Sequence, residues 1–213
     1  MTRYRDATRS ARAKKHDPGF GGTGFLGKQA VRSALAHNLR VRSVSRHGET
    51  AASFNVDQIT ADIGDDRSLA AAVAGSSSVV NAVSLYVEKR RSFDSVHVEG
   101  AARVARLAKQ AGVQHLLHVS GIGADPRSTS AYIRSRGEGE WAVRAAFAQA
   151  TIVRSAVMFG AGDAFIQPLI KVLRASPIFP LFGRGNTKLE PAHVTDVAKA
   201  IVEIVVRPES GPV

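Results

Sequence analysis

Residues 21–27 read Gly21-Gly22-Thr23-Gly24-Phe25-Leu26-Gly27, and the helix-like stretch KQAVRSALAH follows directly from residue 28. Glycines spaced three apart favour a strand-to-helix turn that holds a pyrophosphate. Gly21 permits a tight turn, Gly24 lets a phosphate approach the main chain, and Gly27 lets the helix pack closely. The unpaired N–H groups and the dipole at the start of a helix favour the same anion. Alone the motif is weak, and an ordinary glycine-rich loop is the alternative.

The composition indicates a globular chain with a single α/β domain. Of its 213 residues, 44% are hydrophobic and 22% are charged, which suffices for one good core. The absence of cysteine excludes disulfides and cysteine-bound metal, and no apolar run approaches the ~20 residues that span a bilayer. The net charge is +11, but no basic strip is interleaved with aromatic residues. We therefore predict a solvated basic surface, with no specific nucleic-acid partner and no metal site.

Residues 1–19 lack the buried strand that should precede the glycine turn. The segment holds six Lys or Arg against two Asp, a net charge of +4, and ends in Pro18-Gly19. A central parallel strand should read as a continuous Val/Ile/Leu run, and only Phe20 fits. The explanations are a disordered basic tail, a targeting peptide or a misread start; the two Asp count against the second, and we favour the third. We expect a disordered tail or misread start over 1–19, with the first strand degenerate or missing.

Beyond the turn, helix-type and strand-type patterns alternate along the chain. The alternation predicts crossover units and a mostly parallel sheet with helices on both faces. No repeat or linker interrupts it, so residues 20–213 are expected to form one domain. The predicted helices span 28–37, 68–74, 93–111, 132–149 and 194–206, and the predicted strands span 39–45, 54–60, 79–83, 114–120 and 150–158.

Further motifs follow the glycine turn in a fixed order: Ala61-Asp62-Ile63, Val80-Asn81-Ala82, His118-Val119-Ser120 and Tyr132-Ile133-Arg134-Ser135. Together they resemble an extended or atypical short-chain dehydrogenase/reductase. The phrases SAYIRSRGEGEWAVR, VMFGAGDAFI and SPIFPLFGRGNTKLEPAHVTDVAKAI are similar to the nucleoside-diphosphate-sugar epimerase-like branch, which includes the nucleotide-binding accessory subunit of respiratory complex I. The resemblance runs from residue 20 to about 204. It implies a Rossmann-type doubly wound α/β fold with a truncated C-terminal substrate region.

The resemblance implies a dinucleotide cofactor, NADP(H) in preference to NAD(H). Arg46 stands where a carboxylate would bind the ribose hydroxyls of NAD, and a cation there suits the 2′-phosphate of NADP; a plain surface arginine is the alternative. Asp62 with Ile63 would face the adenine, unless Asp62 is only a cap or turn residue. The segment Asn81, Ala82, Val83 would run beneath the nicotinamide-side ribose, and the pyrophosphate would lie on Gly21, Thr23, Gly24, Phe25, Leu26 and Gly27.

The family chemistry needs a tyrosine acid/base, a serine that orients the substrate, and a lysine four residues after the tyrosine. Tyr132 and Ser120 match the first two, but Arg136 occupies the lysine position. Residues 132 and 136 share a helix face, yet an arginine is planar and never deprotonates. Cofactor binding is compatible with this change, whereas a proton relay is in doubt. Tyr132 is accordingly either catalytic or a ring that only packs on the cofactor.

Two functions follow from the resemblance. The chain either holds NADP(H) as a structural part of a respiratory or quinone-linked assembly with little turnover, or it is an active NADP-dependent oxidoreductase or epimerase/dehydratase. Expected locations are the cytoplasm of a bacterium, with membrane association only through partners, or the mitochondrial matrix of a eukaryote. The pair Arg154-Ser155 replaces a usual Arg-Pro and is expected to loosen a nearby loop. The remaining polar candidates for a substrate cleft are Asp163, Gln167, Arg184 and His193.

Overall fold

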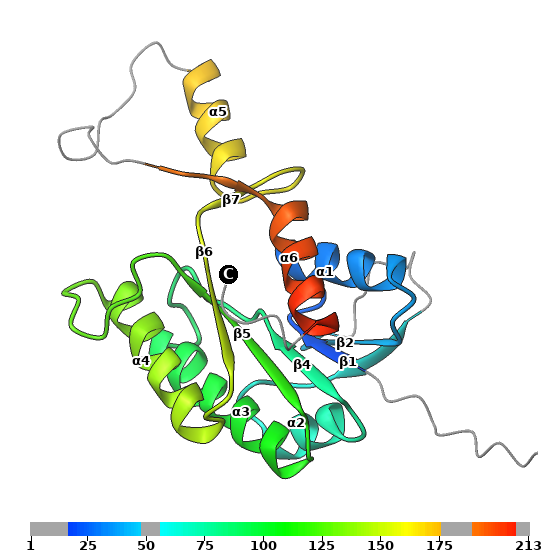
Figure 1. The fold of residues 1–213 in the computed structure, drawn as a ribbon. Coiled ribbons are helices and arrows are strands. Elements are labelled where there is room, and N and C mark those ends of the chain that lie inside the picture. The colour runs from blue at the N-terminus through cyan, green and yellow to red at the C-terminus, as the bar shows by residue number, and fades with distance from the viewer. Residues whose placement is uncertain (1–16, 48–55, 176–188, 208–213) are drawn as a thin grey trace, which may run out of the picture.

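The computed structural model describes residues 17–47, 56–175 and 189–207, with only the backbone described for 17–20. Six parallel strands form one sheet in the order β3-β2-β1-β4-β5-β6 (Figure 1). The order reverses between β1 and β4, so the carboxyl ends of these two strands flank a crevice of the kind that binds ligands in such sheets. The strands are β1 (Asp17–Phe20), β2 (Val41–Ser45), β3 (Asp57–Thr60), β4 (Ser78–Asn81), β5 (His115–Gly121) and β6 (Thr151–Ser155).

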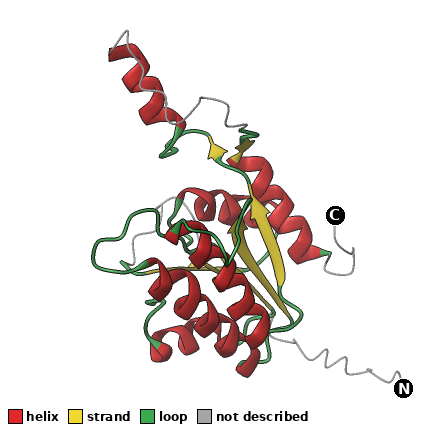
Figure 2. Cartoon of the chain, turned by 90° about the vertical axis from the view of Figure 1, so that its left-hand side faces the viewer, coloured by secondary structure: helices red, strands yellow, loops and turns green. Residues whose placement is uncertain are grey.

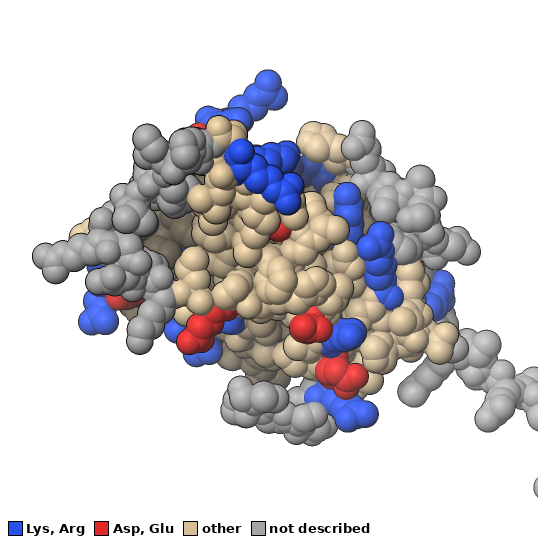
Figure 3. Space-filling model, turned by 90° about the horizontal axis from the view of Figure 1, so that it is seen from above, with Lys and Arg blue, Asp and Glu red and all other residues tan. Residues whose placement is uncertain are grey.

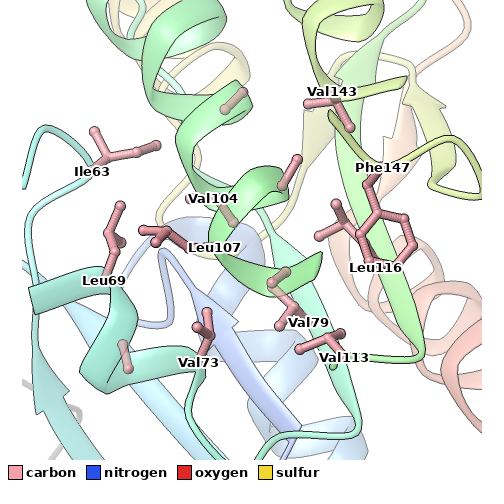
Figure 4. Packing of buried hydrophobic residues seen from close by; sticks show 14 of the residues in the cluster. Ile63, Leu69, Val73, Val79, Val104, Leu107, Val113, Leu116, Val143 and Phe147 are labelled. Carbon is pink, nitrogen blue, oxygen red and sulfur yellow. The ribbon is translucent and has the colours of Figure 1, made fainter. Parts of the chain in front are cut away.

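Helices cover both faces of this sheet, as the alternation of the sequence predicts. One buried cluster joins α2, α3 and α4 to one face (Figure 4), and a second joins α1 and α6 to the other. A π-helical segment, η1 (Asp94–Gly100), runs directly into α3. The helices are α1 (Phe25–Ala36), α2 (Asp66–Val73), α3 (Ala101–Gln110), α4 (Ala131–Ala146), α5 (Ile166–Ala175) and α6 (Val194–Val206).

Strand β5 shows why the sheet needs cover on both sides. Leu116 belongs to the cluster under α2, α3 and α4, whereas its neighbour Leu117 belongs to the cluster under α1 and α6. Successive side chains of a strand point to opposite faces, so a strand buried on both faces reads as a continuous apolar run. Residues 116–120 of β5 are all buried, although His118 and Ser120 make this run only partly apolar.

A second, two-stranded sheet pairs β7 (Met158–Phe159) with β8 (Ala192–His193). Figures 1 and 2 both show α5, which follows β7, standing away from the six-stranded sheet. No residue of α5 is buried against the rest of the described chain. Neither α5 nor β8 is predicted by the sequence patterns, and the predicted strand 150–158 is divided into β6 and β7.

The first strand corrects one expectation. Of the two outcomes predicted for it, a degenerate and a missing strand, the second is wrong: β1 is present and begins at Asp17, inside the predicted tail. It pairs in parallel with β2 over all four residues and with β4 at Gly19 and Phe20. The pairing is possible because main-chain groups make a ladder without apolar side chains, although Pro18 has no N–H and can only accept. Residues 1–16 lie outside the described part of the chain.

The composition of β1 leaves an apolar pocket that is partly open to solvent. A cavity of about 50 Å³ lies between α1, α6 and the sheet. Val41 and Val80 line it, and their partners in the ladder are residues 17 and 19 of β1. Partners in register face the same side of a sheet, so Gly19 lies where a strand side chain would otherwise fill this space.

Candidate functional site

The glycine turn between β1 and α1 has the backbone geometry that the motif requires. Gly21 has φ +82°, a left-handed conformation, and a Cβ on it would lie 3.1 Å from the Ala82 main chain. Gly27 packs against the turn itself, since a Cβ there would lie 2.0 Å from the Gly21 carbonyl oxygen. Side chains are therefore excluded at both positions, which draws α1 and the end of β4 tightly around the turn.

Gly24 differs from the other two glycines because it is exposed, although a Cβ on it would still lie 3.1 Å from the Gly21 carbonyl oxygen. It is the residue before α1, no described side chain caps the helix there, and the first turn of α1 holds no acidic residue. The leading N–H groups of α1 are thus available to an anion. Thr23 and Phe25 are half-buried beside it, whereas Leu26 is buried in the core under α6.

Arg46 and Asp62 lie at the carboxyl ends of β2 and β3, as predicted, and a third residue joins them. Arg91, from the loop after β4, donates from Nη2 to both carboxylate oxygens of Asp62 at 2.6 Å. Burial alone would raise the pKa of Asp62, but the Arg91 hydrogen bonds, the Gly64 N–H and the charges of Arg91 and Arg46 lower it overall. Ile63 instead turns into the core, where it contacts Gly100.

Asn81 ends β4, and both polar atoms of its side chain form hydrogen bonds. Its Oδ1 accepts from the Val83 N–H at 3.2 Å, which fixes the orientation of the amide, and its Nδ2 then donates to His118 Nδ1 at 3.2 Å. His118 is consequently protonated on Nε2 when neutral. Burial and the nearby charge of Arg136 lower its pKa to about 4, although Glu140 acts in the opposite direction. Asn81 therefore both ends the strand and ties the next two residues, Ala82 and Val83, to β5.

Tyr132 opens α4 within a cluster of aromatic rings. Its ring stacks on Tyr86 with centroids 6.1 Å apart and meets Phe93 and His97 edge-on at 5.5 and 5.7 Å. Ser130 caps α4 by accepting from the Ile133 N–H. Tyr86 and Phe93 come from the loop between β4 and η1, so Tyr132 lies against the segment that follows Asn81.

Arg136 is buried, with 6% of its surface exposed. Its Nη2 donates to the Val119 carbonyl at 2.9 Å and its Nη1 to Ser84 Oγ at 3.1 Å. Its Nε is buried without a hydrogen-bond partner in the described chain. The guanidinium thus spans the end of β5 and the loop after β4, on the same helix face as Tyr132 but below it.

Ser120 is buried near the end of β5, and its Oγ has no partner with hydrogen-bond geometry in the described chain. It adjoins Glu140, whose pKa burial would raise but which the Arg154 hydrogen bonds, the Ser120 hydroxyl and the Arg154 and His118 charges lower overall. Arg154 binds both Glu140 oxygens, with a closest distance of 2.7 Å. Ser155 donates to the Ser120 carbonyl at 3.3 Å. The Arg154-Ser155 pair therefore secures this part of the chain instead of loosening it.

The remaining polar candidates have structural contacts. Asp163 Oδ1 accepts from three backbone N–H groups at the start of α5, including that of Gln167. His193 caps α6 and bonds to Thr195. Arg184 lies outside the described residues. No group of described residues has the ligands for a metal ion, and no described helix is long and apolar enough to cross a bilayer.

Several residues of this region are missed by sequence reasoning: Ser84, Arg91, His97, Ser135 and Glu140. His97 lies in a helix whose apolar stripe gives no reason to single out one polar residue. Arg91 ends the run Lys89-Arg90-Arg91, which resembles a solvated basic surface. On the face seen in Figure 3, basic side chains stand in separate groups, some of them beside acidic side chains. Only the three-dimensional contacts separate Arg91 from its neighbours.

Comparison with known proteins identifies the family of the chain. The model of the NAD dependent epimerase/dehydratase family matches residues 20–213. The mitochondrial NADH dehydrogenase (ubiquinone) 1 alpha subcomplex subunit 9 of Arabidopsis thaliana is 32% identical over 86% of this chain and 48% of its own length. The ceramide reductase of Caulobacter vibrioides is 31% identical over 90% of this chain and 61% of its own length. The chain thus spans about half the length of the curated relatives it matches.

Solved structures share the fold. The dTDP-glucose 4,6-dehydratase DesIV of Streptomyces venezuelae, solved with NAD and TYD bound, superposes with a TM-score of 0.74. The match covers 89% of this chain and 71% of that one at 21% identity. At this identity the likeness establishes the Rossmann-like architecture alone.

Proposed function

Because the chain belongs to the NAD-dependent epimerase/dehydratase family, we propose that it binds NADP(H) and holds it with little turnover, as a component of a respiratory or quinone-linked assembly. The family is one of NAD(P)-binding proteins; the choice of NADP(H), the low turnover and the assembly are the proposal. The observation that carries it is the burial of Arg136.

A catalytic lysine at position 136 would present a mobile ammonium that binds the ribose and lowers the pKa of the tyrosine phenol. The guanidinium of Arg136 instead donates hydrogen bonds to the Val119 carbonyl and to Ser84 Oγ. A guanidinium engaged in this way stays charged and cannot relay a proton. This supports a cofactor that is bound in place and not consumed.

The preference for NADP(H) rests on Arg46. It is exposed directly after β2 and close enough to Asp62 to contribute to the lowered pKa of that carboxyl. With Arg91 beside the same carboxylate, this corner carries two cations against one anion. A surplus of positive charge at the end of β2 suits a ribose 2′-phosphate.

The respiratory or quinone-linked role draws on the relatives. NADH dehydrogenase (ubiquinone) subunits from Arabidopsis thaliana and other organisms match 86–90% of this chain at 30–32% identity. In a eukaryotic host this proposal places the chain in the mitochondrial matrix, and in a bacterium at the cytoplasmic side of the membrane through its partners.

Tyr132 and Ser120 support a second candidate, an active NADP-dependent reductase or epimerase/dehydratase. Tyr132 stands at the start of α4 with its ring partly exposed, and Ser120 Oγ is unpaired. The half-buried Tyr132 ring can meet a substrate directly, whereas Ser120 is buried and would have to be uncovered first. The relative that names such an activity is the ceramide reductase.

Single-turnover oxidation of bound NADPH separates the two candidates. Wild type, Arg136→Lys and Tyr132→Phe are each loaded with NADPH and mixed with candidate carbonyl and quinone substrates, and absorbance at 340 nm is followed. We expect negligible oxidation in the wild type and tight retention of NADPH. Steady oxidation that Tyr132→Phe abolishes would establish the enzyme instead. Mass spectrometry of the natively purified protein tests the assembly, because co-purifying respiratory subunits are expected.

A further inference from the structure

Buried His97 connects three separate segments of the candidate site. Its Nε2 lies 3.0 Å from the Leu85 N–H, in the loop after β4. Its Nδ1 lies 2.9 Å from Ser135 Oγ, on α4. Ser135 Oγ in turn donates to the Tyr132 carbonyl at 2.9 Å. His97 itself belongs to η1, so one imidazole joins the loop, η1 and the first turn of α4.

In this series of hydrogen bonds, only one assignment of donors and acceptors is consistent. A backbone N–H can only donate, so His97 Nε2 accepts from Leu85 and carries no proton. A neutral imidazole then has its proton on Nδ1 and donates it to Ser135 Oγ. The Ser135 hydroxyl is left to donate to the Tyr132 carbonyl, which can only accept. Every group in the series is therefore satisfied by the tautomer with Nδ1 protonated.

The surroundings of His97 keep it neutral. Only 3% of its surface is exposed, and burial together with the charge of Arg136 lowers its pKa to about 4. A second proton would remove the acceptor for Leu85 and add a buried cation near Arg136.

The ring of His97 also defines where the Tyr132 ring can lie. It stacks on Phe93 with centroids 5.6 Å apart and 9° between the planes, and it meets Tyr132 edge-on. Farther along α4, a Cβ on Gly139 would lie 2.1 Å from the His97 carbonyl oxygen. Helix α4 is thus held against His97 both by its side chain and by its backbone.

We propose that His97 is the positioning residue of the candidate site, fixing the Tyr132 ring relative to the loop after β4 through Ser135. The inference rests on the proposed function only in that Tyr132 faces the nicotinamide; the arrangement itself belongs to the protein without nucleotide. His97 acts through Tyr132, and its described contacts are all with protein groups.

Three tyrosines are present in the chain, at 4, 86 and 132, so the position of Tyr132 can be followed directly. With ¹³C-labelled tyrosine, Tyr132→Phe identifies the Tyr132 signal in the nucleotide-free protein. Ser135→Ala removes the link while leaving the His97 ring in place, and His97→Phe keeps a ring but removes both nitrogens. We expect each variant to displace or broaden the Tyr132 signal. Leu69→Ala, which opens a cavity in the core under α2, should destabilise the fold without moving this signal.

The ¹⁵N shifts of the wild-type imidazole at pH 7 give an independent reading, and we expect Nδ1 protonated and Nε2 unprotonated. A Tyr132 signal unchanged in Ser135→Ala, one moved equally by Leu69→Ala, or a proton on Nε2 would each overturn the inference. If His97→Phe does not fold, the Ser135 variant and the tautomer still decide. NADPH added to the wild type distinguishes the two proposals: absence of binding counts against the proposed function, while the tyrosine signals without nucleotide still report on His97.

Discussion

Arg136 Nη2 donates to the Val119 carbonyl across 2.9 Å, although the two residues are 17 positions apart and lie on α4 and β5. The same guanidinium reaches Ser84 Oγ and lowers the pKa of both His97 and His118. A single buried arginine therefore organises the interior of this site.

Replacing Arg136 tests that organising role. Arg136→Met removes both donors and leaves a buried carbonyl unpaired, so the free energy of unfolding should fall by about 2–4 kcal/mol in urea titrations. The pKa values of His97 and His118 should rise in the same variant, as NMR titration can show, because a repelling cation is gone. Arg136→Lys is the matched control and should retain most of the histidine effect. Unchanged histidine titrations in Arg136→Met would refute the assigned role.

The two buried histidines predict an acid-sensitive fold. Their pKa values are lowered from 6.5 to about 4. Between these two pH values the unfolded chain therefore binds more protons than the folded chain. Stability should be constant above about pH 6.5 and fall as the pH drops toward 4, by up to about 3 kcal/mol for each histidine. The free energy of unfolding measured by urea at several pH values checks this. His97→Phe should flatten part of the slope, and a slope that it leaves untouched would exclude His97 as a source.

Arg46→Ala should weaken NADPH much more than NADH. Losing a charge-assisted hydrogen bond to phosphate costs about 1.5–3 kcal/mol, which corresponds to roughly 10- to 150-fold in the dissociation constant. Calorimetric titration of both nucleotides is the measurement. Equal affinity of the wild type for NADPH and NADH would contradict the assignment. Gly24→Val is the complementary variant: a Cβ at position 24 would lie 3.1 Å from the Gly21 carbonyl oxygen, so the turn has to shift slightly, and both nucleotides should lose their site.

Gly19→Val should stabilise the protein by filling the pocket above β1. Residual cavities cost about 24 cal/mol per Å³, so the 50 Å³ cavity corresponds to about 1 kcal/mol, or a rise in Tm of about 2–4 °C for a domain of this size. Thermal unfolding by circular dichroism checks it. Gly27→Ala should act in the opposite direction, since its Cβ would collide with the Gly21 carbonyl. A lower Tm for Gly19→Val would show that the space cannot accept a side chain.

The sequence patterns predict the fold well where periodicity is strong. The strand predicted at 114–120 and the helix predicted at 194–206 are found as β5, at 115–121, and α6, at 194–206. They mislead at β1, where Asp17-Pro18-Gly19 pairs through its main chain despite an unsuitable composition. Helix α5 is missed because Pro168 lies within it, at a position in the first turn where proline is tolerated.

The candidate site is only partly readable from sequence for a related reason. The glycines and the residues that end strands follow local spacing, so Gly21, Asp62 and Asn81 can be found by pattern. The contacts of Arg91 with Asp62 and of His97 with Ser135 join segments 29 and 38 residues apart. Contacts of that range depend on how helices and loops pack, which no local pattern records.

The ion pair of Asp62 with Arg91 limits what a ligand at this turn can donate to the Asp62 carboxylate. A carboxylate oxygen has two lone pairs for hydrogen bonding. Oδ1 of Asp62 already accepts from Arg91 and from the Gly64 N–H, whereas Oδ2 accepts only from Arg91. One acceptor position is left, on Oδ2, enough for a single N–H of an exocyclic amine. A base that requires two acceptors at this turn has to displace Arg91 first and gives up part of its binding energy to do so.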